Sequence, residues 1–223
     1  MCPLSQADCM SEYHKIETLY ERDEKTFKVK VGQFKNRTYT LLKTWHWTEK
    51  VDGTNIRIIW DPSQKFPDSA KPALTFGGKS DNAQMHADLV KWLYENVTDA
   101  KMREVFPDVS AVVYGEGYGA GIQKGGDYSP VKKVIVFDVL VDGKWWLNDE
   151  GMRDVAAKLS LDAVPSFGEM TLENATELVR QGFKSKCAVV NSRDAEGLVG
   201  RPLETLFDKK GARLIVKLKT KDF

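Results

Sequence analysis

The stretch WTEKVDGTNIRI, from Trp47 to Ile58, decides how this chain folds. Aromatic and β-branched residues stand at both of its ends, a composition typical of two strands. Its middle carries polar side chains around one glycine, Gly53: these are Glu49, Lys50, Asp52 and Asn55. A lysine beside a turn is usually a solvated surface charge. Here an apolar strand follows at once, and a glycine lets the backbone approach a ligand closely, so we predict a binding site at the bend.

Lys50 is the candidate nucleophile of this site. Loss of hydration between sheets disfavours the charged form of an ammonium group. The neutral amine that results is the nucleophilic form of a lysine side chain. The bend therefore predicts covalent chemistry at Lys50, against the alternative of a surface charge.

The composition is that of a soluble globular chain. Of the 223 residues, 42% are hydrophobic and 29% are charged, which is enough apolar material for a buried core. No uncharged apolar stretch is long enough to span a membrane, and the start, MCPLSQADCM, is not a secretory signal. Cys2, Cys9 and Cys187 fit neither a metal site nor a disulfide scaffold, so we expect reduced thiols. We therefore expect a cytoplasmic, intracellular protein without a membrane partner.

The distribution of charge is more informative than its sum. The formal net charge of +1 neither favours nor excludes a polyanionic partner, because nucleic-acid binding requires a basic patch and not a basic average. Basic residues crowd near the C-terminus: Lys209, Lys210, Arg213, Lys217, Lys219 and Lys221. No internal repeat or linker interrupts the chain, so we predict a single domain over residues 1–223.

The order of strand-like and helix-like segments predicts an α+β fold. Runs of β-branched and aromatic residues predict strands at 38–47, 55–60, 109–115, 133–141, 144–147, 188–190, 197–199 and 213–218. Helical periodicity and capping residues predict helices at 83–97, 149–159 and 172–181. Asp142-Gly143 predicts a two-residue hairpin turn, and Lys210-Gly211 is a weaker signal of the same kind. Because the strands come in hairpins, we predict mainly antiparallel sheets with flanking helices and not a Rossmann fold.

A glycine-rich segment, VVYGEGYGAGIQKGGDY at 112–128, carries the next candidate. It nearly matches the dinucleotide fingerprint, but no helix is expected after it, so that match is weak. We interpret it as a strand that ends at Tyr114 and a loop that presents Glu116. The Glu116 carboxylate could hold a ribose hydroxyl or a metal; the alternative is a plain glycine-rich turn.

Phe137 lies in the strand-like run KKVIVFDVLVDGKWW at 132–146. Alternation predicts that Phe137 and Ile135 share one face and that Asp138 lies on the other. Phe137 would ordinarily be a core residue. At a cleft it could instead stack on a nucleobase.

Two further groups favour phosphate and metal chemistry. Glu196 precedes a strand-like run and could bind a metal, or it could be a solvated loop acid. Lys217 and Lys219 stand two positions apart, so on a strand both side chains leave the same face. Two converging ammonium groups repel each other unless a phosphate neutralises them; a polar edge strand is the alternative.

Several common catalytic sites are excluded. The chain has no P-loop, no H-E-x-x-H motif and no G-x-S-x-G motif, and it contains only three histidines. A histidine-based metal site or a serine triad is therefore not expected.

The order of the motifs resembles that of covalent nucleotidyltransferases. Six blocks carry the likeness: EKVDGTN at 49–55, FGGKSD at 76–81, GEGYGAGIQKGGDY at 115–128, VIVFDV at 134–139, EGLVG at 196–200 and VKLKTK at 216–221. They are most similar to the phage-type RNA ligase 2 family, which includes the RNA-editing ligases. The run GAGIQKGGDY resembles RNA ligases more than DNA ligases or capping enzymes. The resemblance implies a nucleotidyltransferase (ATP-grasp-like) domain.

The resemblance also implies residue roles at the nucleotide. Lys50 would attack the α-phosphate of ATP and form a lysyl–AMP adduct, and Glu49 would help to recognise adenine. Further implied nucleotide contacts are Glu116 at the ribose, Phe137 stacked on adenine, Lys79 at the ribose and the RNA end, and Asn55 near the metal and phosphate. Lys79 stands where family members often carry arginine, and Asp52 where some carry histidine.

At the phosphates, the resemblance implies that Glu196 binds the catalytic metal, Mg²⁺ or Mn²⁺. It implies that Lys217 and Lys219 hold the α-phosphate. Nearby cations would offset charge on the non-bridging oxygens during transfer.

The function implied is an ATP-dependent RNA ligase that joins RNA 3′-OH and 5′-phosphate ends, with a nicked duplex as one form of substrate. The alternatives are an ATP-dependent DNA ligase, a capping-type nucleotidyltransferase and a non-catalytic nucleic-acid-binding relative. We expect a monomer without a separate C-terminal RNA-binding domain. RNA would then be held by the core, by the basic segment Lys28–Arg37 or by a partner.

Overall fold

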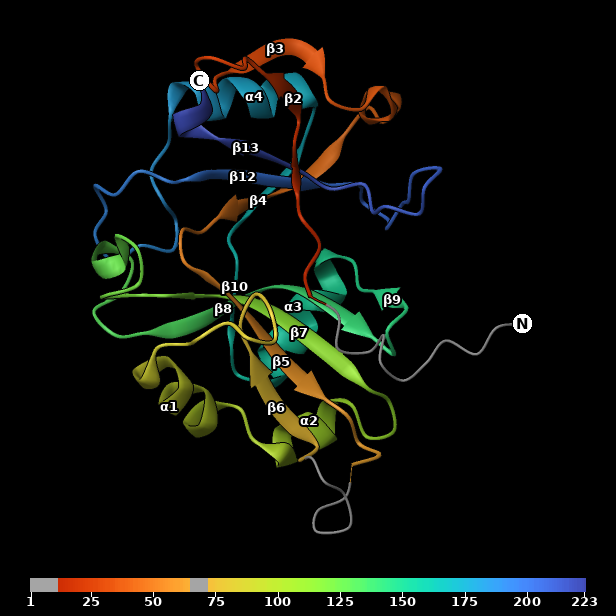
Figure 1. Ribbon diagram of the computed structural model, residues 1–223, viewed down its shortest axis with the longest axis vertical. Helices are drawn as coiled ribbons and strands as arrows, with labels where there is room; N and C mark the ends of the chain where they lie inside the picture. The colour runs from red at the N-terminus through yellow and green to blue at the C-terminus, as the bar shows by residue number, and fades with distance from the viewer. Residues whose placement is uncertain (1–11, 65–71) are drawn as a thin grey trace. The chain divides into compact units, whose positions relative to one another are not determined.

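The computed structural model describes residues 12–64 and 72–223. The chain divides into two compact units (Figure 1). Unit 1 comprises Gly53–Ala163 and the described end of Met1–His14; unit 2 comprises Lys15–Asp52 and Val164–Phe223. The chain passes from unit 2 to unit 1 between Asp52 and Gly53, inside the stretch WTEKVDGTNIRI. The prediction of a single nucleotidyltransferase domain stays a prediction.

Unit 2 is built on a five-stranded sheet in the order β1-β13-β12-β4-β11. All neighbours pair antiparallel except β1 and β13, which are parallel. The strands are β1 (Glu17–Thr18), β4 (Trp45–Lys50), β11 (Ser166–Met170), β12 (Gly197–Arg201) and β13 (Val216–Lys219). The other elements of the unit are the hairpin of β2 (Tyr20–Arg22) and β3 (Val29–Phe34), the short helices η2 (Arg37–Leu41) and η4 (Thr220–Asp222), and α4 (Leu172–Gln181).

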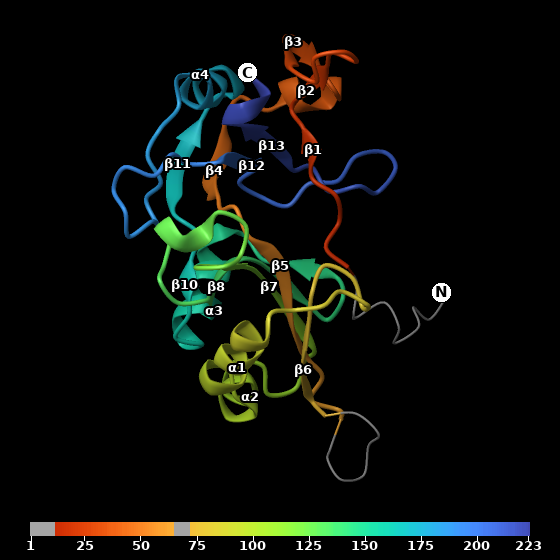
Figure 2. The ribbon, with the colours of Figure 1, turned by 60° about the vertical axis from the view of Figure 1, so that its left-hand side comes forward.

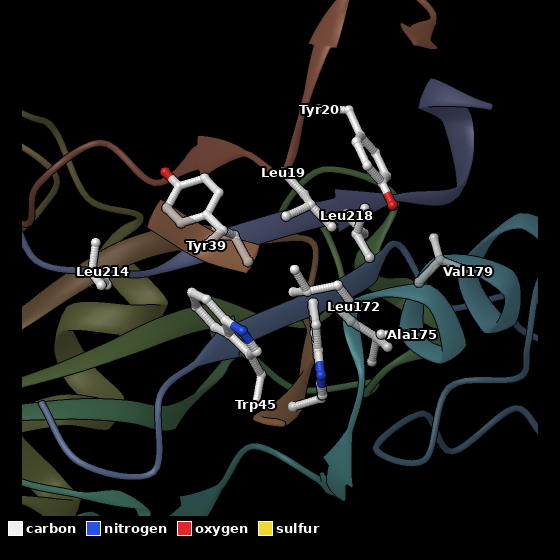
Figure 3. Packing of buried hydrophobic residues seen from close by; sticks show 12 residues of the cluster. Leu19, Tyr20, Tyr39, Trp45, Leu172, Ala175, Val179, Leu214 and Leu218 are labelled. Carbon is white, nitrogen blue, oxygen red and sulfur yellow. The ribbon is translucent and has the colours of Figure 1, made fainter. Parts of the chain in front are cut away.

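One face of the unit 2 sheet is the core. Alternation along β4 puts Trp45 and Trp47 on this face, and both rings are fully buried. Their cluster includes Leu198 of β12 and apolar residues of α4. The α4 residues are Leu172, Ala175 and Val179 (Figure 3). The opposite face of the same strands therefore remains for polar side chains.

Unit 1 is built on a sheet in the order β10-β8-β7-β5-β6 (Figure 2). Strand β9 pairs with β8. Its strands are β5 (Thr54–Trp60), β6 (Leu74–Gly77), β7 (Ala111–Tyr118), β8 (Lys133–Val141), β9 (Trp145–Trp146) and β10 (Asp162–Ala163). Only β10 pairs parallel to its neighbour. The helical elements are α1 (Ala87–Asn96), α2 (Asp99–Val105), α3 (Asp149–Lys158) and the short helix η3 (Gly125–Asp127).

The two faces of the unit 1 sheet also differ. On one face Gly117 of β7 packs closely against Leu89 of α1 and Ile56 of β5. The other face carries a smaller cluster of Ile59, Val112, Tyr114 and Leu140. Asn55 and Arg57 stand four and two positions before Ile59 on the same strand, so their side chains leave the sheet on this second face as well.

The fold class is confirmed, and the two best-capped helices occur where they were predicted. Both α3 and α4 start at their predicted caps: Asn148 accepts a hydrogen bond from the Gly151 amide, and Thr171 from the Asn174 amide. Gly182 ends α4 with a φ of 75°. The first predicted helix is shorter than expected, because α1 begins only at Ala87.

The hairpin predicted at Asp142-Gly143 is present, but the pairing of Val141 with Trp145 leaves three residues, 142–144, in its loop instead of two. The hairpin joins β8 to β9, and Asp142 and Gly143 have φ values of 54° and 64°. Positive φ at both central positions is the geometry of a type I′ turn.

Other strand predictions were wrong. Residues 37–41 form η2 instead of a strand, because the Asn36 side chain accepts the Thr38 amide and caps a turn. Residues 188–190 form no strand, and β13 begins at Val216 instead of 213. The strand expected to end at Tyr114 continues to Tyr118, so Glu116 lies inside β7 and not in a loop.

The strands β1, β2, β3, β6, β10 and β11 and the helix α2 were not predicted. In the described residues, no helix is of a length and hydropathy that would cross a bilayer.

Gly200 tests the packing of the unit 2 core. A Cβ at this position would lie 2.6–2.8 Å from three ring carbons of Trp47, whose buried ring has little room to move. We expect Gly200→Ala to lower the free energy of unfolding by about 1–3 kcal/mol, measured by urea denaturation. Gly126→Ala is the control, because nothing lies within 4 Å of its added Cβ; equal effects of both changes would contradict this packing.

Candidate functional site

Two lysines of unit 2 converge on one carboxylate. Lys50 Nζ lies 2.6 Å from Glu196 Oε2, and Lys219 Nζ lies 2.6 Å from Glu196 Oε1. The three side chains are 22%, 18% and 13% exposed for Lys50, Lys219 and Glu196, respectively. This charge cluster therefore sits in a mostly desolvated place, where electrostatic interactions are stronger than in water.

The strand register explains the convergence. Lys50 pairs with Gly197 of β12, and Gly197 pairs with Lys219 of β13. The three residues form one row across the sheet, so both lysines leave it on the same face. Gly197 has no side chain to separate them; an added Cβ would lie 1.9 Å from the Leu218 carbonyl oxygen. Glu196, the preceding residue, supplies the carboxylate between the two ammonium groups.

Lys217 joins this face one row further along. It pairs with Val199, which in turn pairs with Thr48. Burial, together with the positive charges of Lys219 and Lys50, lowers the pKa of Lys217 to about 8. Burial by itself would raise the pKa of Glu196, but the Lys50 and Lys219 ammonium groups outweigh it and lower that pKa. The face thus combines an ionised carboxylate with more cationic groups than it can neutralise, which suits a phosphate.

Glu49 leaves β4 on the opposite face from Lys50, where it is 2% exposed. Its carboxylate accepts hydrogen bonds from the Ser185 hydroxyl and, at 2.8 Å, from the Lys186 amide. Its own amide donates to the Pro165 carbonyl. These bonds hold the end of β4 that carries Lys50.

Cys187 completes the segment that holds Glu49. Its thiol lies 3.4 Å from Glu49 Oε1. Burial raises the pKa of the thiol to about 12, and the Glu49 charge acts in the same direction. Cys187 is a free cysteine, as predicted; Cys2 and Cys9 lie outside the described residues.

Asn55 and Glu116 lie side by side in unit 1. They are directly paired between β5 and β7, so their side chains leave the same face of the sheet. The Asn55 Oδ1 atom is buried and accepts no hydrogen bond from the described residues. An unsatisfied buried acceptor is costly, and a bound ligand with a donor group or a cation would satisfy it.

Gly53 starts unit 1 close to these residues. An added Cβ would lie 2.2 Å from the Gly117 carbonyl oxygen. The predicted close approach of the backbone at Gly53 is therefore an approach to β7 of the same unit.

Phe137 shares the face of Asn55 and Glu116. The register between β7 and β8 shifts opposite Tyr114 and Gly115, which leaves Phe137 as the extra residue of a bulge. The predicted alternation is therefore wrong here, because Asp138 pairs with Tyr114 and lies on the same face as Phe137. Phe137 is half-buried and packs edge-on against Tyr13, whose hydroxyl donates to Asp138 at 2.7 Å.

Lys79 lies in an exposed loop after β6. The loop is held by Arg57, a guanidinium that is only 1% exposed. Arg57 Nε donates to the Gly78 carbonyl at 2.8 Å, and Nη2 donates to Asp81 Oδ1 at 2.7 Å. These bonds flank Lys79 on both sides and fix its backbone.

The site residues thus fall into two sets, one in each unit. Unit 2 brings together Lys50, Glu196, Lys217 and Lys219, and holds Glu49 behind them. Unit 1 brings Asn55, Glu116 and Phe137 to one face and carries Lys79 on its own loop. Ser185, Arg57, Tyr13 and Asp138 support these residues and were not predicted, because their partners are far away in the sequence.

Glu196 is the carboxylate that could hold a metal in unit 2. The described residues contain no group of three or more histidine, cysteine, aspartate or glutamate side chains suited to one ion. A carboxylate oxygen is a ligand that Mg²⁺ and Mn²⁺ accept, and Mg²⁺ commonly binds through one or two carboxylates with water and substrate phosphates. The donor set therefore fits a cation held jointly with a nucleotide.

Residues 43–219 match the RNA ligase family. The chain belongs to this family, as the resemblance of its motifs implied. A search of the curated proteins found no match.

Solved structures share the fold at low sequence identity. A variant of Naegleria gruberi RNA ligase with AMP and Mn has a TM-score of 0.63 and 15% identity; the match covers 93% of this chain and 61% of that one. Another variant of that ligase, with ATP and Mn, has a TM-score of 0.61 and 17% identity, over 93% and 60%. The same ligase with PPi has a TM-score of 0.58 and 18% identity, over 99% and 62%. This chain thus spans about three-fifths of the length of these proteins.

The lowered pKa of Lys217 predicts a pH dependence of stability. Between pH values of about 8 and 10.5, the unfolded chain binds more protons at Lys217 than the folded chain does. The contribution of Lys217 to the free energy of unfolding therefore increases as the pH rises through this range. At lower pH the half-buried charge destabilises the fold. Lys217→Met should therefore raise the free energy of unfolding at pH 7 by roughly 1–2 kcal/mol, less than the full shift because solvent screens the group.

This gain should shrink as the pH rises through that window in urea denaturation series. Lys209→Met, at an exposed position, is the control and should show no such trend. A gain that is independent of pH would argue against a depressed pKa at Lys217.

Proposed function

We propose that this chain is an ATP-dependent RNA ligase that joins RNA 3′-OH and 5′-phosphate ends. The observation that carries the proposal is the convergence of Lys50 and Lys219 on Glu196, with Lys217 on the same face. Membership of the RNA ligase family supports the choice of RNA. Solved structures of Naegleria gruberi RNA ligase variants contain ATP and Mn or AMP and Mn. This supports the choice of nucleotide and cation.

In the first step Lys50 would attack the α-phosphorus of ATP. The N–P bond forms while the bond from the α-phosphorus to the bridging oxygen breaks, and pyrophosphate leaves with that electron pair. The ammonium proton must leave first, and Glu196 Oε2 at 2.6 Å is an acceptor for it. Lysine suits this role and arginine does not, because the lysine amine can deprotonate.

The lysines of β13 would hold the phosphate during this transfer. Lys217 and Lys219 present two cationic groups on the face of Lys50. They would offset the charge that gathers on the non-bridging oxygens, which is the main way that proteins assist phosphoryl transfer. Glu196 would hold Mg²⁺ or Mn²⁺, and the bound cation would supply further charge neutralisation.

The residues of unit 1 would bind the nucleoside. Phe137 would stack on adenine, Glu116 would accept from a ribose hydroxyl, and Lys79 would contact the ribose and the RNA end. The buried Asn55 Oδ1 atom would gain a partner near the metal and phosphate. Glu49 would contribute to adenine recognition, although its carboxylate would have to exchange its bonds to Ser185 and Lys186 for bonds to the base.

Two further steps would complete ligation. The RNA 5′-phosphate attacks the lysyl–AMP phosphorus, the N–P bond breaks, and Lys50 is released with an RNA-adenylate formed. The RNA 3′-OH then attacks the 5′-phosphate, and AMP leaves. A nicked duplex is one RNA substrate that presents both ends together, and we propose that the chain acts as a monomer in the cytoplasm.

The nucleophile is tested by incubation with ATP labelled at the α-phosphate, together with Mg²⁺ or Mn²⁺. We expect a covalent protein–AMP adduct with the unaltered chain and none with Lys50→Ala, because no amine remains at that position. Denaturing gels detect the label, and mass spectrometry of peptides locates it. Lys91→Ala, at an exposed lysine of α1, is the control and should label normally.

Other outcomes separate the alternatives. Label that persists in Lys50→Ala and maps to Lys217 would reassign the nucleophile. Labelling by GTP instead of ATP would favour a capping-type enzyme, and sealing of DNA ends alone would favour a DNA ligase. Absence of an adduct in the unaltered chain would favour a binding relative without turnover.

Stacking is tested at Phe137 by a change that preserves packing. Phe137→Leu keeps an apolar side chain against Tyr13 and the surrounding cluster but removes the aromatic face. We expect ATP binding to weaken by about 1–3 kcal/mol, measured by calorimetry, with little change in thermal stability. Unchanged affinity would return Phe137 to a core role.

A further inference from the structure

A small hairpin projects from unit 2 between β12 and β13 (Figures 1 and 2). Its arms are joined by a bond from the Leu214 amide to the Leu206 carbonyl and by a bridge between Phe207 and Arg213. A hairpin is therefore present where Lys210-Gly211 predicted one, but its loop spans residues 208–212 and is not a two-residue turn. Gly211 adopts a φ of 77° and its amide donates to the Asp208 carbonyl.

The acidic residue of the turn, Asp208, forms its hydrogen bonds within the turn. The Asp208 carboxylate accepts the backbone amides of Lys210, at 2.8 Å, and Ala212, at 2.9 Å. The basic side chains remain at the surface: Lys209 and Lys210 are exposed at the tip. Glu204 is the other acid of the segment 203–213, which carries three basic residues against these two acids.

The same hairpin and the segment just before it expose large apolar side chains. Phe207 is 52% exposed, and Leu203 and Leu206 are 47% and 39% exposed. A solvated turn requires no aromatic residue, and exposed apolar groups beside cations are typical of a contact surface. Because Phe207 and Arg213 face each other across the hairpin, a ring and a guanidinium lie on the same side.

The hairpin leads directly into the strand of the phosphate-binding lysines. Arg213 stands four positions before Lys217, about 13 Å of extended chain. A strand of nucleic acid whose terminal phosphate lies at Lys217 and Lys219 would therefore have its next nucleotides within reach of the hairpin. Single-stranded nucleic acid is commonly bound by a row of cations for the backbone and an aromatic ring for the bases.

We propose that hairpin 206–214 binds single-stranded RNA next to the end that is joined. Phe207 stacks on a base, while Lys209, Lys210 and Arg213 contact backbone phosphates. The proposal rests on the proposed function for the identity of the ligand as RNA. The proposed RNA-binding residues lie outside the segment Lys28–Arg37, and none of them belongs to the nucleotide site.

The test is the affinity for a short 5′-phosphorylated single-stranded RNA, measured by fluorescence anisotropy at several salt concentrations. Phe207→Ala should weaken binding by roughly 5- to 150-fold through loss of stacking. The double variant Lys209→Ala/Lys210→Ala should also bind more weakly. Its slope of log affinity against log salt should be smaller by about 1.4, since two phosphate contacts are lost.

Matched controls carry the same changes on unit 1. Tyr94 is an aromatic residue of α1 that is 64% exposed, and Lys91 and Lys158 are exposed lysines of α1 and α3. Tyr94→Ala and Lys91→Ala/Lys158→Ala should bind RNA as the unaltered chain does. If they weaken binding as much as the hairpin variants, the hairpin has no special role and the proposal fails.

Adenylation of the same variants separates this proposal from the proposed function. The hairpin variants should form the protein–AMP adduct at the normal rate, because no hairpin residue belongs to the nucleotide site. If Phe207→Ala also loses adenylation, its fold is damaged and the lysine variant decides. RNA binding that is unchanged in both hairpin variants overturns the proposal, and then the exposed surface belongs to a protein contact. An unaltered chain that binds RNA through the hairpin but forms no adduct refutes only the proposed function.

Discussion

The structure of unit 2 depends on one electrostatic constraint: two ammonium groups share a single carboxylate. Lys50 and Lys219 are held apart only by the width of a glycine-containing strand, and both contact Glu196 at 2.6 Å. Two cations this close would repel strongly in a poorly hydrated place. Glu196 compensates the charges of Lys50 and Lys219, while Lys217 leaves the face with surplus positive charge. The same face is therefore complementary to a phosphate.

The two faces of the unit 2 sheet have different roles. The core face buries Trp45 and Trp47 against α4, and the opposite face carries the lysines. Side chains alternate between the two faces along β4. The packing that fixes Trp45 and Trp47 on the core face therefore also fixes Lys50 on the opposite face, just before the bend. Glu49 adds a second restraint, since its buried carboxylate ties the end of β4 to the segment after α4. Rigid support of this kind is what the proposed role of Lys50 as a nucleophile requires.

In unit 1 candidate residues also share one face of a sheet, and fewer of them are charged. Asn55 and Glu116 are neighbours in register, and a bulge turns Phe137 and Asp138 toward the same face. Buried Arg57 holds the loop of Lys79 through bonds on both sides of that residue. In both units most candidate residues project from strands, while Glu196 directly precedes β12 and Lys79 lies in a loop. Residues distant in the sequence hold them in place.

The sequence by itself determined the local features whose causes are local. Caps at Asn148 and Thr171, the hairpin at Asp142-Gly143 and the two-residue spacing of Lys217 and Lys219 all act within a few residues, and each is confirmed. Motif order was also sufficient for the family. Only the tertiary structure decided that Glu196 lies between Lys50 and Lys219, that Glu116 belongs to a strand, and that a bulge shifts Phe137. These features depend on strand register, and register is set by packing between residues that are far apart in the chain.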